Sequence, residues 1–267
     1  MKKPNGIILL VIAIALLLPL IFTVWGSFID ASGVLQIPPK LSAHYTLQNY
    51  QKIVTQLKPI WFVNTIILTI VGVGLSLLVS VLSGFGLYLQ NNKAVIAILI
   101  ISTVIPRYAI TIPQFLIIRY MGLTNTLLAC VLPLLVTPMH ILLARTFFEQ
   151  FPKSVIDAAQ IDGLSRFGAL FRIILPESKH LLIALGVLKS VELWGDYLWQ
   201  YIVLREEGKK TFYLGAVSWI QQAGGDSALR INPVGISLAV SVLLMIPFIM
   251  IFSAGSRYFM YQLGGVE

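Results

Sequence analysis

The sequence has few charged residues and almost no cysteine. Charged residues make up 11% of its 267 residues, whereas a typical soluble domain has about a quarter. A single cysteine, Cys130, excludes an internal disulfide and any metal site of the Cys-x-x-Cys type. The net charge of +8 is scattered along the chain rather than clustered, so we expect no nucleic-acid partner. These deficits favour a membrane protein.

The usual motifs of catalysis are also missing. The run Gly208–Thr211 resembles the end of a phosphate-binding loop, but Val203 stands where that motif needs its first glycine, and Lys210 occupies its Ser/Thr position. The sequence has no nucleophile elbow, and its three histidines are too far apart to predict a metal site. We therefore predict no enzymatic activity, no catalytic residue and no metal or cofactor bound by this chain.

Long hydrophobic runs dominate what remains. A helix needs about 20 mostly apolar residues to cross a bilayer, and spans must be helical because lipid offers the backbone no hydrogen-bond partners. The first run is too long for a signal-peptide core and lacks a cleavage site, so we interpret it as a retained span. The sequence predicts an all-α membrane protein with six transmembrane helices, at residues 7–28, 61–89, 94–118, 125–147, 180–204 and 235–260.

The basic residues suggest how these spans are oriented. Lys2 and Lys3 directly precede the first span, which places the N-terminus in the cytoplasm by the positive-inside rule. Basic residues of the longer loops divide almost evenly between the two sides. Six spans then leave the C-terminus cytoplasmic as well. This topology predicts one transmembrane domain over residues 1–267, with outer loops 29–60 and 205–234 and a cytoplasmic segment 148–179.

The cytoplasmic segment contains a charged, patterned stretch, SVIDAAQIDGLSRFGALFRIILP, at residues 154–176. Ser154 and Asp157 resemble a capping box, which predicts a helix that begins at Ser154 with Asp157 in its first turn. Gly163 is a natural helix end, Ser165 can cap a second helix, and a proline near the end of the stretch stops it. Short helices are marginal alone in water. They must therefore dock on the membrane surface, on the chain's own helical bundle or on a partner protein, and the residues support the membrane surface and a partner protein equally.

The same stretch resembles the EAA loop of permease subunits of ATP-binding-cassette (ABC) importers. DAAQIDG (157–163) and IILP (173–176) match the family pattern E-A-A-x-x-D-G followed by I-x-L-P, with Asp157 in place of glutamate. LWGDYLWQYIVLR (193–205) is similar to the fifth span of carbohydrate-uptake permeases, with Gly195 as one departure. The chain thus resembles the type I, MetI-like permeases, in particular the second permease of maltose- and glycerol-3-phosphate-type systems.

The resemblance implies a function and a set of partners. In that family the loop is a coupling helix that sits in a cleft on the ATP-hydrolysing subunit. The partners it implies are two copies of an ABC ATPase subunit that bind ATP and Mg, a homologous sister permease and an extracytoplasmic solute-binding protein. The implied cargo is a sugar or oligosaccharide crossing the cytoplasmic (inner) membrane, with a glycerol phosphate or related polyol as the alternative. The implied ATPase-contacting residues are Asp157, Ala158, Ala159, Asp162, Gly163, Arg166 and Pro176.

Ionisable residues inside the fifth predicted span are candidates for a substrate pathway. Charges at membrane depth normally face a bundle interior or a watery cavity. Glu192 and Asp196 are four residues apart, so we predict that they share a helical face, which Trp199 extends while Trp194 lies to its side. Carboxylates and flat aromatic rings suit the hydroxyls and C–H faces of a sugar. Lys189 is interpreted as a structural ion-pair partner of Glu192.

Arg107 is the corresponding candidate in the third predicted span. It lies between Pro106 and Pro113, which interrupt a helix, and it can pair with one of the two carboxylates or meet an anionic ligand. A rival hypothesis is an ion-driven carrier with an ion relay in the fifth span, but such carriers have internal repeats, which this sequence lacks. A non-transporting scaffold is a third hypothesis, disfavoured by the ionisable residues within the spans.

Overall fold

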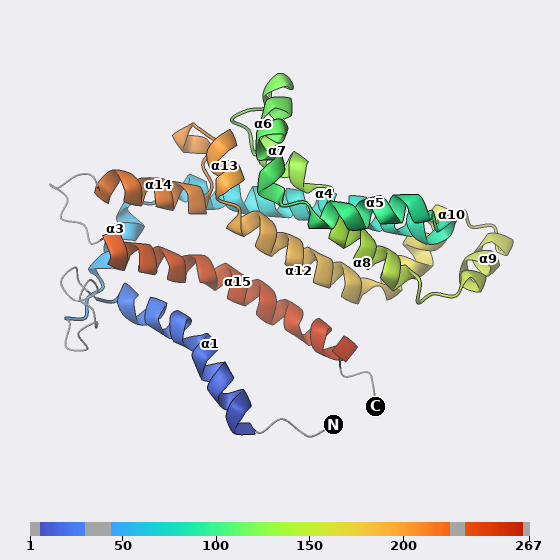
Figure 1. Ribbon diagram of the computed structural model, residues 1–267, viewed down its shortest axis with the longest axis horizontal. Coiled ribbons are helices and arrows are strands. Elements are labelled where there is room, and N and C mark those ends of the chain that lie inside the picture. The colour runs from blue at the N-terminus through green and yellow to red at the C-terminus, as the bar shows by residue number, and fades with distance from the viewer. Residues whose placement is uncertain (1–5, 30–43, 225–232, 264–267) are drawn as a thin grey trace. The chain divides into compact units, whose positions relative to one another are not determined.

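The computed structural model describes residues 6–29, 44–224 and 233–263, and this part of the chain is mainly helical (Figure 1). Within it, an antiparallel bridge between Ile29 and Tyr45 is the sole β-type pairing. The predicted all-α class is therefore confirmed. The chain forms two compact units, Met1–Trp61 with Phe212–Met250 and Phe62–Thr211 with Ile251–Glu267. The single domain over residues 1–267 stays a prediction.

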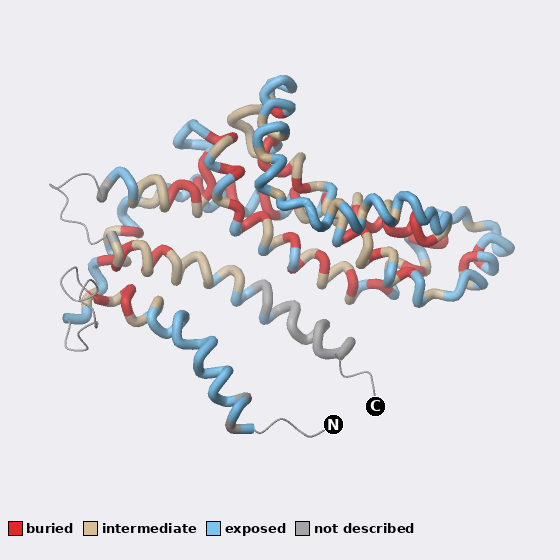
Figure 2. Tube along the Cα trace, in the orientation of Figure 1, coloured by how far each residue is buried: buried red, intermediate tan, exposed pale blue. Residues whose placement is uncertain are grey.

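The first unit has a small core of its own. Its helices are α1 (Gly6–Ser27), α3 (Gln48–Gln56), α14 (Phe212–Gly224) and most of α15 (Pro233–Leu263). Asn49 of α3 donates from its amide to the carbonyls of Ser27 (2.9 Å) and Ile29 (3.0 Å), which fixes the end of α1. Most of α1 is exposed and apolar (Figure 2), as expected of a helix that faces lipid. The core consists of Ile53, Ala216, Ile236, Ala239 and Val240.

The second unit contains most of the helices, with α4 belonging to it from Phe62 onward. They are α4 (Pro59–Gln90), α5 (Lys93–Val104), η1 (Arg107–Ile110), α6 (Thr111–Tyr120), α7 (Leu127–Val131), η2 (Leu132–Leu134), α8 (Pro138–Phe148), α9 (Lys153–Ile161), α10 (Arg166–Ala169), η3 (Leu170–Ile174), α11 (Leu175–Glu177), α12 (Lys179–Gly195), α13 (Leu198–Val203) and η4 (Glu207–Lys209). Gly84 lets α4 approach α8 closely, since a Cβ there would lie 2.7 Å from that of Ala144. The core of this unit consists of Val81, Phe85, Tyr88, Ala144, Phe148, Ile156, Leu170, Ile174, Leu181 and Leu185.

Three of the predicted spans are broken. The chain bends by 97° between α5 and the η1–α6 pair, and by 52° between the α7–η2 pair and α8. Each bend lies just before or at a proline, Pro106 or Pro138, because a proline disfavours a helical conformation in the residue before it. The third break separates α12, which ends at Gly195, from α13, which begins at Leu198. Side chains at the three breaks meet in the site described below.

The number of spans stays a prediction. Among the described residues, the helices Leu10–Ser27 and Pro59–Gln90 are each long and apolar enough to cross a membrane. Each of the two bent pairs also passes if it is counted as one span. The other two predicted spans, 180–204 and 235–260, coincide with α12–α13 and with α15.

The predicted loops contain helices as well as irregular chain. Outer loop 29–60 contains α3, and outer loop 205–234 contains α14, whose Leu214 and Ala216 are buried. Other parts of these predictions lie outside the described residues. They are 30–43, 225–232 and the two chain ends (1–5 and 264–267), which include Lys2 and Lys3 and both termini whose cytoplasmic location was predicted.

Candidate functional site

The stretch at residues 154–176, called the coupling segment below, begins within helix α9. This helix starts at Lys153 after Pro152, and no side chain caps its first turn. The predicted capping box is therefore wrong: Ser154 is the second residue of the helix, because the fixed φ of Pro152 already sets the helix start. Asp157 accordingly lies in the second turn rather than the first.

The end of α9 follows the sequence prediction. Gly163 has a φ of +84°, a left-handed conformation that favours glycine. The N–H of Leu164 donates to the carbonyl of Ala159 (2.9 Å) and that of Gly163 to Gln160 (3.0 Å), which is the Schellman arrangement of a helix end. Ser165 then caps α10 as predicted, since its hydroxyl accepts from the N–H of Gly168 at 3.0 Å.

The second half of the coupling segment continues further than predicted. After α10 the backbone widens into a π-helical turn, η3, and then returns to α-helix in α11, which extends to Glu177. The prediction that Pro176 ends the helix is therefore wrong. A π-turn of this kind re-spaces the carbonyls that a following proline would otherwise clash with, so the helix passes through Pro176.

One face of the coupling segment is anchored in the second unit. Ile156 is 3% exposed and Leu170 and Ile174 are fully buried, and all three belong to the core formed with α4, α8 and α12. The hydroxyl of Tyr88 on α4 donates to the carbonyl of Phe151, just before α9, at 2.8 Å. Because these contacts fix both halves of the segment, it is part of a packed core and not a free loop.

The opposite face is exposed and carries most of the residues that the resemblance assigned to ATPase contact. Ile161 is 86% exposed and Phe167 is 61% exposed. Of the seven assigned residues, Ala159 is the one buried, so it cannot present its side chain to a partner in this conformation. The others are exposed: Asp157, Ala158, Asp162, Gly163, Arg166 and Pro176.

A small pocket lies beside Asp157. Its volume is about 180 Å³ and its lining includes Lys153, Asp157, Gln160 and Arg166. Although two cations line the same pocket, Asp157 has no ion-pair partner within 4.0 Å among the described residues. The carboxylate is therefore available to a group from outside the described chain.

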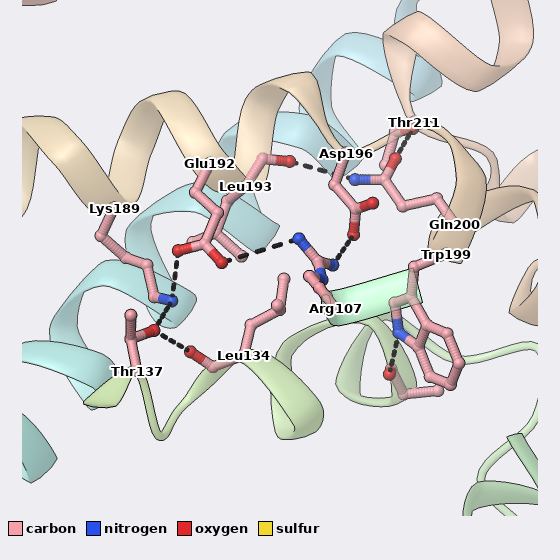
Figure 3. A network of polar contacts seen from close by, with 11 residues as sticks. Arg107, Leu134, Thr137, Lys189, Glu192, Leu193, Asp196, Trp199, Gln200 and Thr211 are labelled. Carbon is pink, nitrogen blue, oxygen red and sulfur yellow. Dashed lines mark hydrogen bonds and ion pairs between the residues drawn. The ribbon is translucent and has the colours of Figure 1, made fainter. Parts of the chain in front are cut away.

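The charged side chains of the third and fifth predicted spans, those of Arg107, Lys189, Glu192 and Asp196, form one connected polar network (Figure 3). Arg107 donates from Nη2 to Asp196 Oδ2 at 2.8 Å, and its Nη1 lies 3.6 Å from Glu192 Oε1. Lys189 Nζ donates to Glu192 Oε2 and to the Thr137 hydroxyl, both at 2.7 Å. Two cations thus face two carboxylates, and the network carries no net charge. The predicted Lys189–Glu192 pair is confirmed, as is the pairing of Arg107 with these carboxylates.

The network joins the three breaks in the predicted spans. Arg107 opens η1 directly after the first break, Thr137 is the residue before α8 at the second, and Asp196 follows α12 at the third. A broken helix leaves backbone groups and side chains turned away from its regular surface. Arg107 reaches Asp196 in this way, and Thr137 joins them through Lys189 and Glu192. Sequence reasoning missed Thr137, although a Thr–Pro pair at 137–138 inside an apolar run was the available signal.

The two tryptophans lie differently from the prediction. Trp199 does not extend a continuous helical face from Asp196, because α12 ends at Gly195 and Trp199 belongs to α13. It is 4% exposed, and its indole N–H donates to the carbonyl of Ala129 at 3.0 Å (Figure 3). Trp194 is also buried and meets the ring of Phe62 edge-on, with centroids 6.0 Å apart. In the described structure both tryptophans therefore pack against protein.

Exposure varies strongly across the network. The side chains of Lys189 and Asp196 are 1% and 4% exposed, whereas those of Glu192 and Arg107 are 27% and 35% exposed. Buried charges are stable only when they are paired and hydrogen-bonded, which the short contacts provide. The carboxylate of Glu192 is thus partly exposed and held by the buried Lys189, and the guanidinium of Arg107 is partly exposed and held by the buried Asp196.

A solved structure has a similar fold. The chain superposes on a crystal structure of a bacterial ABC transporter involved in the import of the acidic polysaccharide alginate with a TM-score of 0.77, covering 96% of this chain and 95% of that one at 22% identity. The fold is therefore that of a type I, MetI-like ABC importer permease, as predicted.

The family follows from the sequence match. Residues 78–260 match the family described as "Binding-protein-dependent transport system inner membrane component", and the chain belongs to this family. It is a membrane protein and a permease component of an ABC importer. This membership leaves the ion-driven carrier and the scaffold hypotheses without support.

Two curated relatives are similar over most of their length. The chain is 32% identical over 229 residues to the arabinooligosaccharides transport system permease protein AraQ of Halalkalibacterium halodurans, which covers 83% of this chain and 80% of the relative. It is 30% identical over 213 residues to the lactose transport system permease protein LacG of Rhizobium radiobacter, with 78% and 76% covered.

Proposed function

We propose that this chain is the permease subunit of an ABC importer for a sugar or oligosaccharide. The observation that carries the proposal is its 32% identity, over 83% of its length, to a permease named for arabinooligosaccharide transport. The charge of the network supports a neutral solute over a glycerol phosphate. Arg107 is already paired with Asp196 and faces Glu192, so its charge is compensated before any anionic ligand arrives.

The substrate pathway is proposed to include Arg107, Glu192 and Asp196, with Trp194 and Trp199 holding them in place. The partly exposed groups of Glu192 and Arg107 offer one acceptor and one donor to the hydroxyls of a sugar. The buried tryptophans fix the backbone on either side of Asp196. Because these groups are fixed, a solute that lacks the matching hydroxyls would leave polar atoms of the site without hydrogen-bond partners. Such a solute would therefore bind more weakly.

Coupling to ATP hydrolysis is proposed to occur through the coupling segment. Its exposed face, with Ile161, Asp162 and Arg166, would contact a partner ATPase, while its buried face packs against α4, α8 and α12. Because the segment is anchored on both halves, closure of the ATPase subunits would displace it as a rigid lever and tilt those helices. ATP and Mg would be bound by the partners, and this chain would hydrolyse nothing.

The proposed assembly contains two copies of an ABC ATPase subunit, a homologous sister permease and an extracytoplasmic solute-binding protein. Membership of a binding-protein-dependent family supports the binding protein. Both termini of this chain are proposed to be cytoplasmic, in line with Lys2 and Lys3 before the first span. The coupling segment then lies on the cytoplasmic side, where an ATPase is found.

Transport by the reconstituted complex tests the proposal. We would measure ATPase activity and uptake in proteoliposomes against a panel of binding-protein ligands that includes oligosaccharides, disaccharides and glycerol phosphates. A sugar is expected to stimulate both activities. Stimulation by glycerol phosphates alone would overturn the assignment of the solute.

Two variants of the coupling segment test the mechanism. Asp162→Arg reverses an exposed charge on the contact face, and Gly163→Pro cannot adopt the φ of +84°. Both are expected to assemble and to retain basal ATPase activity while uptake falls severely. Lys179→Glu, an exposed change beyond the coupling segment, is the matched control and should transport normally. Normal uptake in both segment variants would contradict the coupling role.

A further inference from the structure

A second polar pocket lies away from the network, where α6 and α13 end. Its volume is about 260 Å³, and its polar lining consists of Arg119, Thr124, Asn125 and Arg205. Neither arginine has a carboxylate within 4.0 Å among the described residues, and within the same part of the chain the Thr124 hydroxyl has no hydrogen-bond partner. Two positive charges thus share a pocket with no side chain to neutralise them.

Asn125 fixes the shape of this pocket. Its Oδ1 accepts from the backbone N–H groups of Arg205 (3.1 Å) and Glu206 (3.0 Å), and its own N–H donates to the carbonyl of Val203 at 2.8 Å. Its φ of 63° is unusual for a residue other than glycine and is kept only where the surroundings enforce it. Because Oδ1 is occupied, the orientation of the carboxamide is set, and its NH₂ group remains as a further donor.

The pocket therefore combines two guanidinium groups with an amide donor and a hydroxyl, all on a fixed backbone. Guanidinium groups match the geometry of phosphate and carboxylate oxygens and bind them through paired N–H donors. A donor-rich site whose lining contains no acidic side chain is complementary to an oxyanion. We propose that this pocket binds the phosphate of an anionic phospholipid.

The neighbouring surface favours a lipid over a water-borne anion or an acidic protein. Leu116 and Ile117 of α6 are 57% and 59% exposed, Tyr120 at its end is 93% exposed, and Tyr201 of α13 is 55% exposed. Arg119 and Arg205 directly follow the predicted spans 94–118 and 180–204, so the sequence predicts both arginines at the edge of the apolar layer. Exposed apolar side chains then line the path of the acyl chains, with tyrosines at the interface, where aromatic residues are enriched.

Native mass spectrometry of the co-purified complex tests this site. The complex would be placed in nanodiscs of phosphatidylcholine with phosphatidylglycerol, and the phosphatidylglycerol retained after release would be counted. The double variant Arg119→Gln/Arg205→Gln is expected to lose about tenfold in retained phosphatidylglycerol relative to phosphatidylcholine, since each lost charged contact weakens binding severalfold. Lys209→Gln, an exposed cation nearby that does not line the pocket, is the matched control.

The remaining outcomes decide against the site or its ligand. Equal retention in the double variant and the control would overturn the proposal. Inorganic phosphate could instead raise the melting temperature of the complex in pure phosphatidylcholine nanodiscs, with no phosphatidylglycerol retained. That result would show that the pocket binds free phosphate and would overturn the lipid as its ligand. Weaker docking of the binding protein to the double variant in pure phosphatidylcholine, with unchanged lipid retention, would assign the arginines to an acidic protein surface instead.

A double lysine variant keeps the fold and both positive charges, and it provides a second measurement. Arg119→Lys/Arg205→Lys retains both positive charges but lacks the planar pairs of donors. Retained phosphatidylglycerol is expected to fall about threefold, between wild type and the glutamine variant. Undiminished retention would overturn recognition by the guanidinium groups. None of these readouts depends on which solute the importer carries.

Discussion

In the network around Glu192 every charged side chain has a partner, whereas Asp157, Asp162 and Arg166 of the coupling segment have none within 4.0 Å among the described residues. The network lies between broken spans, where a charge without a partner is costly. The coupling segment carries its charges on an exposed face, where water solvates them. The charges of the network therefore stabilise the structure of the chain itself, whereas those of the coupling segment remain available for a partner.

The two regions also differ in how apolar residues are used. Around the network the tryptophans are buried, and Trp199 is hydrogen-bonded to the backbone of α7. On the coupling segment Ile161 and Phe167 are left exposed although the segment has a well-packed core on its other face. An exposed apolar patch with unpaired charges at its edge is typical of a protein-docking surface.

The largest expected effect comes from breaking the buried pair. Glu192→Gln removes the negative charge that pairs with Lys189, whose side chain is 1% exposed and would keep only neutral acceptors such as the Thr137 hydroxyl. We expect a loss of about 3–5 kcal/mol in stability, the usual result of leaving a buried charge unpaired. Thermal unfolding of the purified complex would measure it.

A double variant separates this explanation from a simple loss of contact. Adding Lys189→Met to Glu192→Gln removes the stranded charge, and most of the lost stability is expected to return. If the double variant is no more stable than Glu192→Gln alone, the loss does not come from an unpaired lysine.

The next effect concerns the docking face and leaves the fold unchanged. Ile161→Glu places a charge at a side chain that is 86% exposed, so stability should change by no more than about 0.5 kcal/mol. Binding of the ATPase subunit is expected to weaken about thirtyfold, corresponding to about 2 kcal/mol for a central interface residue. Titration of the permease complex with the ATPase would show it. Ile161→Leu is the control, and equal affinity in both variants would place the ATPase elsewhere.

A smaller effect is expected at the end of α9. Gly163→Ala forces a side chain into a φ of +84°, which costs about 1–2 kcal/mol. Hydrogen exchange of the amides at Gly163 and Leu164 should accelerate, because these two amides hold the helix end. Gly208→Ala, at a glycine without positive φ and with open space around its Cα, is the control. Unchanged exchange in both would show that the helix end is not under strain.

The smallest effect is expected from a partly exposed ion pair at the end of α8. Arg145 Nη2 lies 2.5 Å from Glu149 Oε1, but the side chain of Glu149 is 44% exposed, and Arg145 also donates to Asn91 Oδ1. Glu149→Gln should therefore cost at most about 1 kcal/mol in thermal unfolding. A loss as large as that of Glu192→Gln would mean that burial does not distinguish the two pairs.

Several features of the site were predictable because they depend on neighbours in the sequence. The Lys189–Glu192 pair follows from three-residue spacing within one helix, and the glycine end of α9 and the cap at Ser165 follow from local backbone chemistry. The capping box at Ser154 failed because Pro152, two positions before Ser154, had already set the helix start.

The rest depends on residues far apart in the sequence. Arg107 and Asp196 are 89 positions apart, and sequence spacing could not say which carboxylate the arginine would meet. Thr137 enters the network only because its span breaks beside the other two, and Trp199 is buried because α13 turns away after Asp196. The apolar runs, the proline break before Arg107, the helix end at Gly163 and the cap at Ser165 follow from the sequence alone, because short-range sterics and hydrophobicity set them. Which breaks meet, and which face of the coupling segment stays exposed, depends on the fold as a whole, because packing brings distant side chains together.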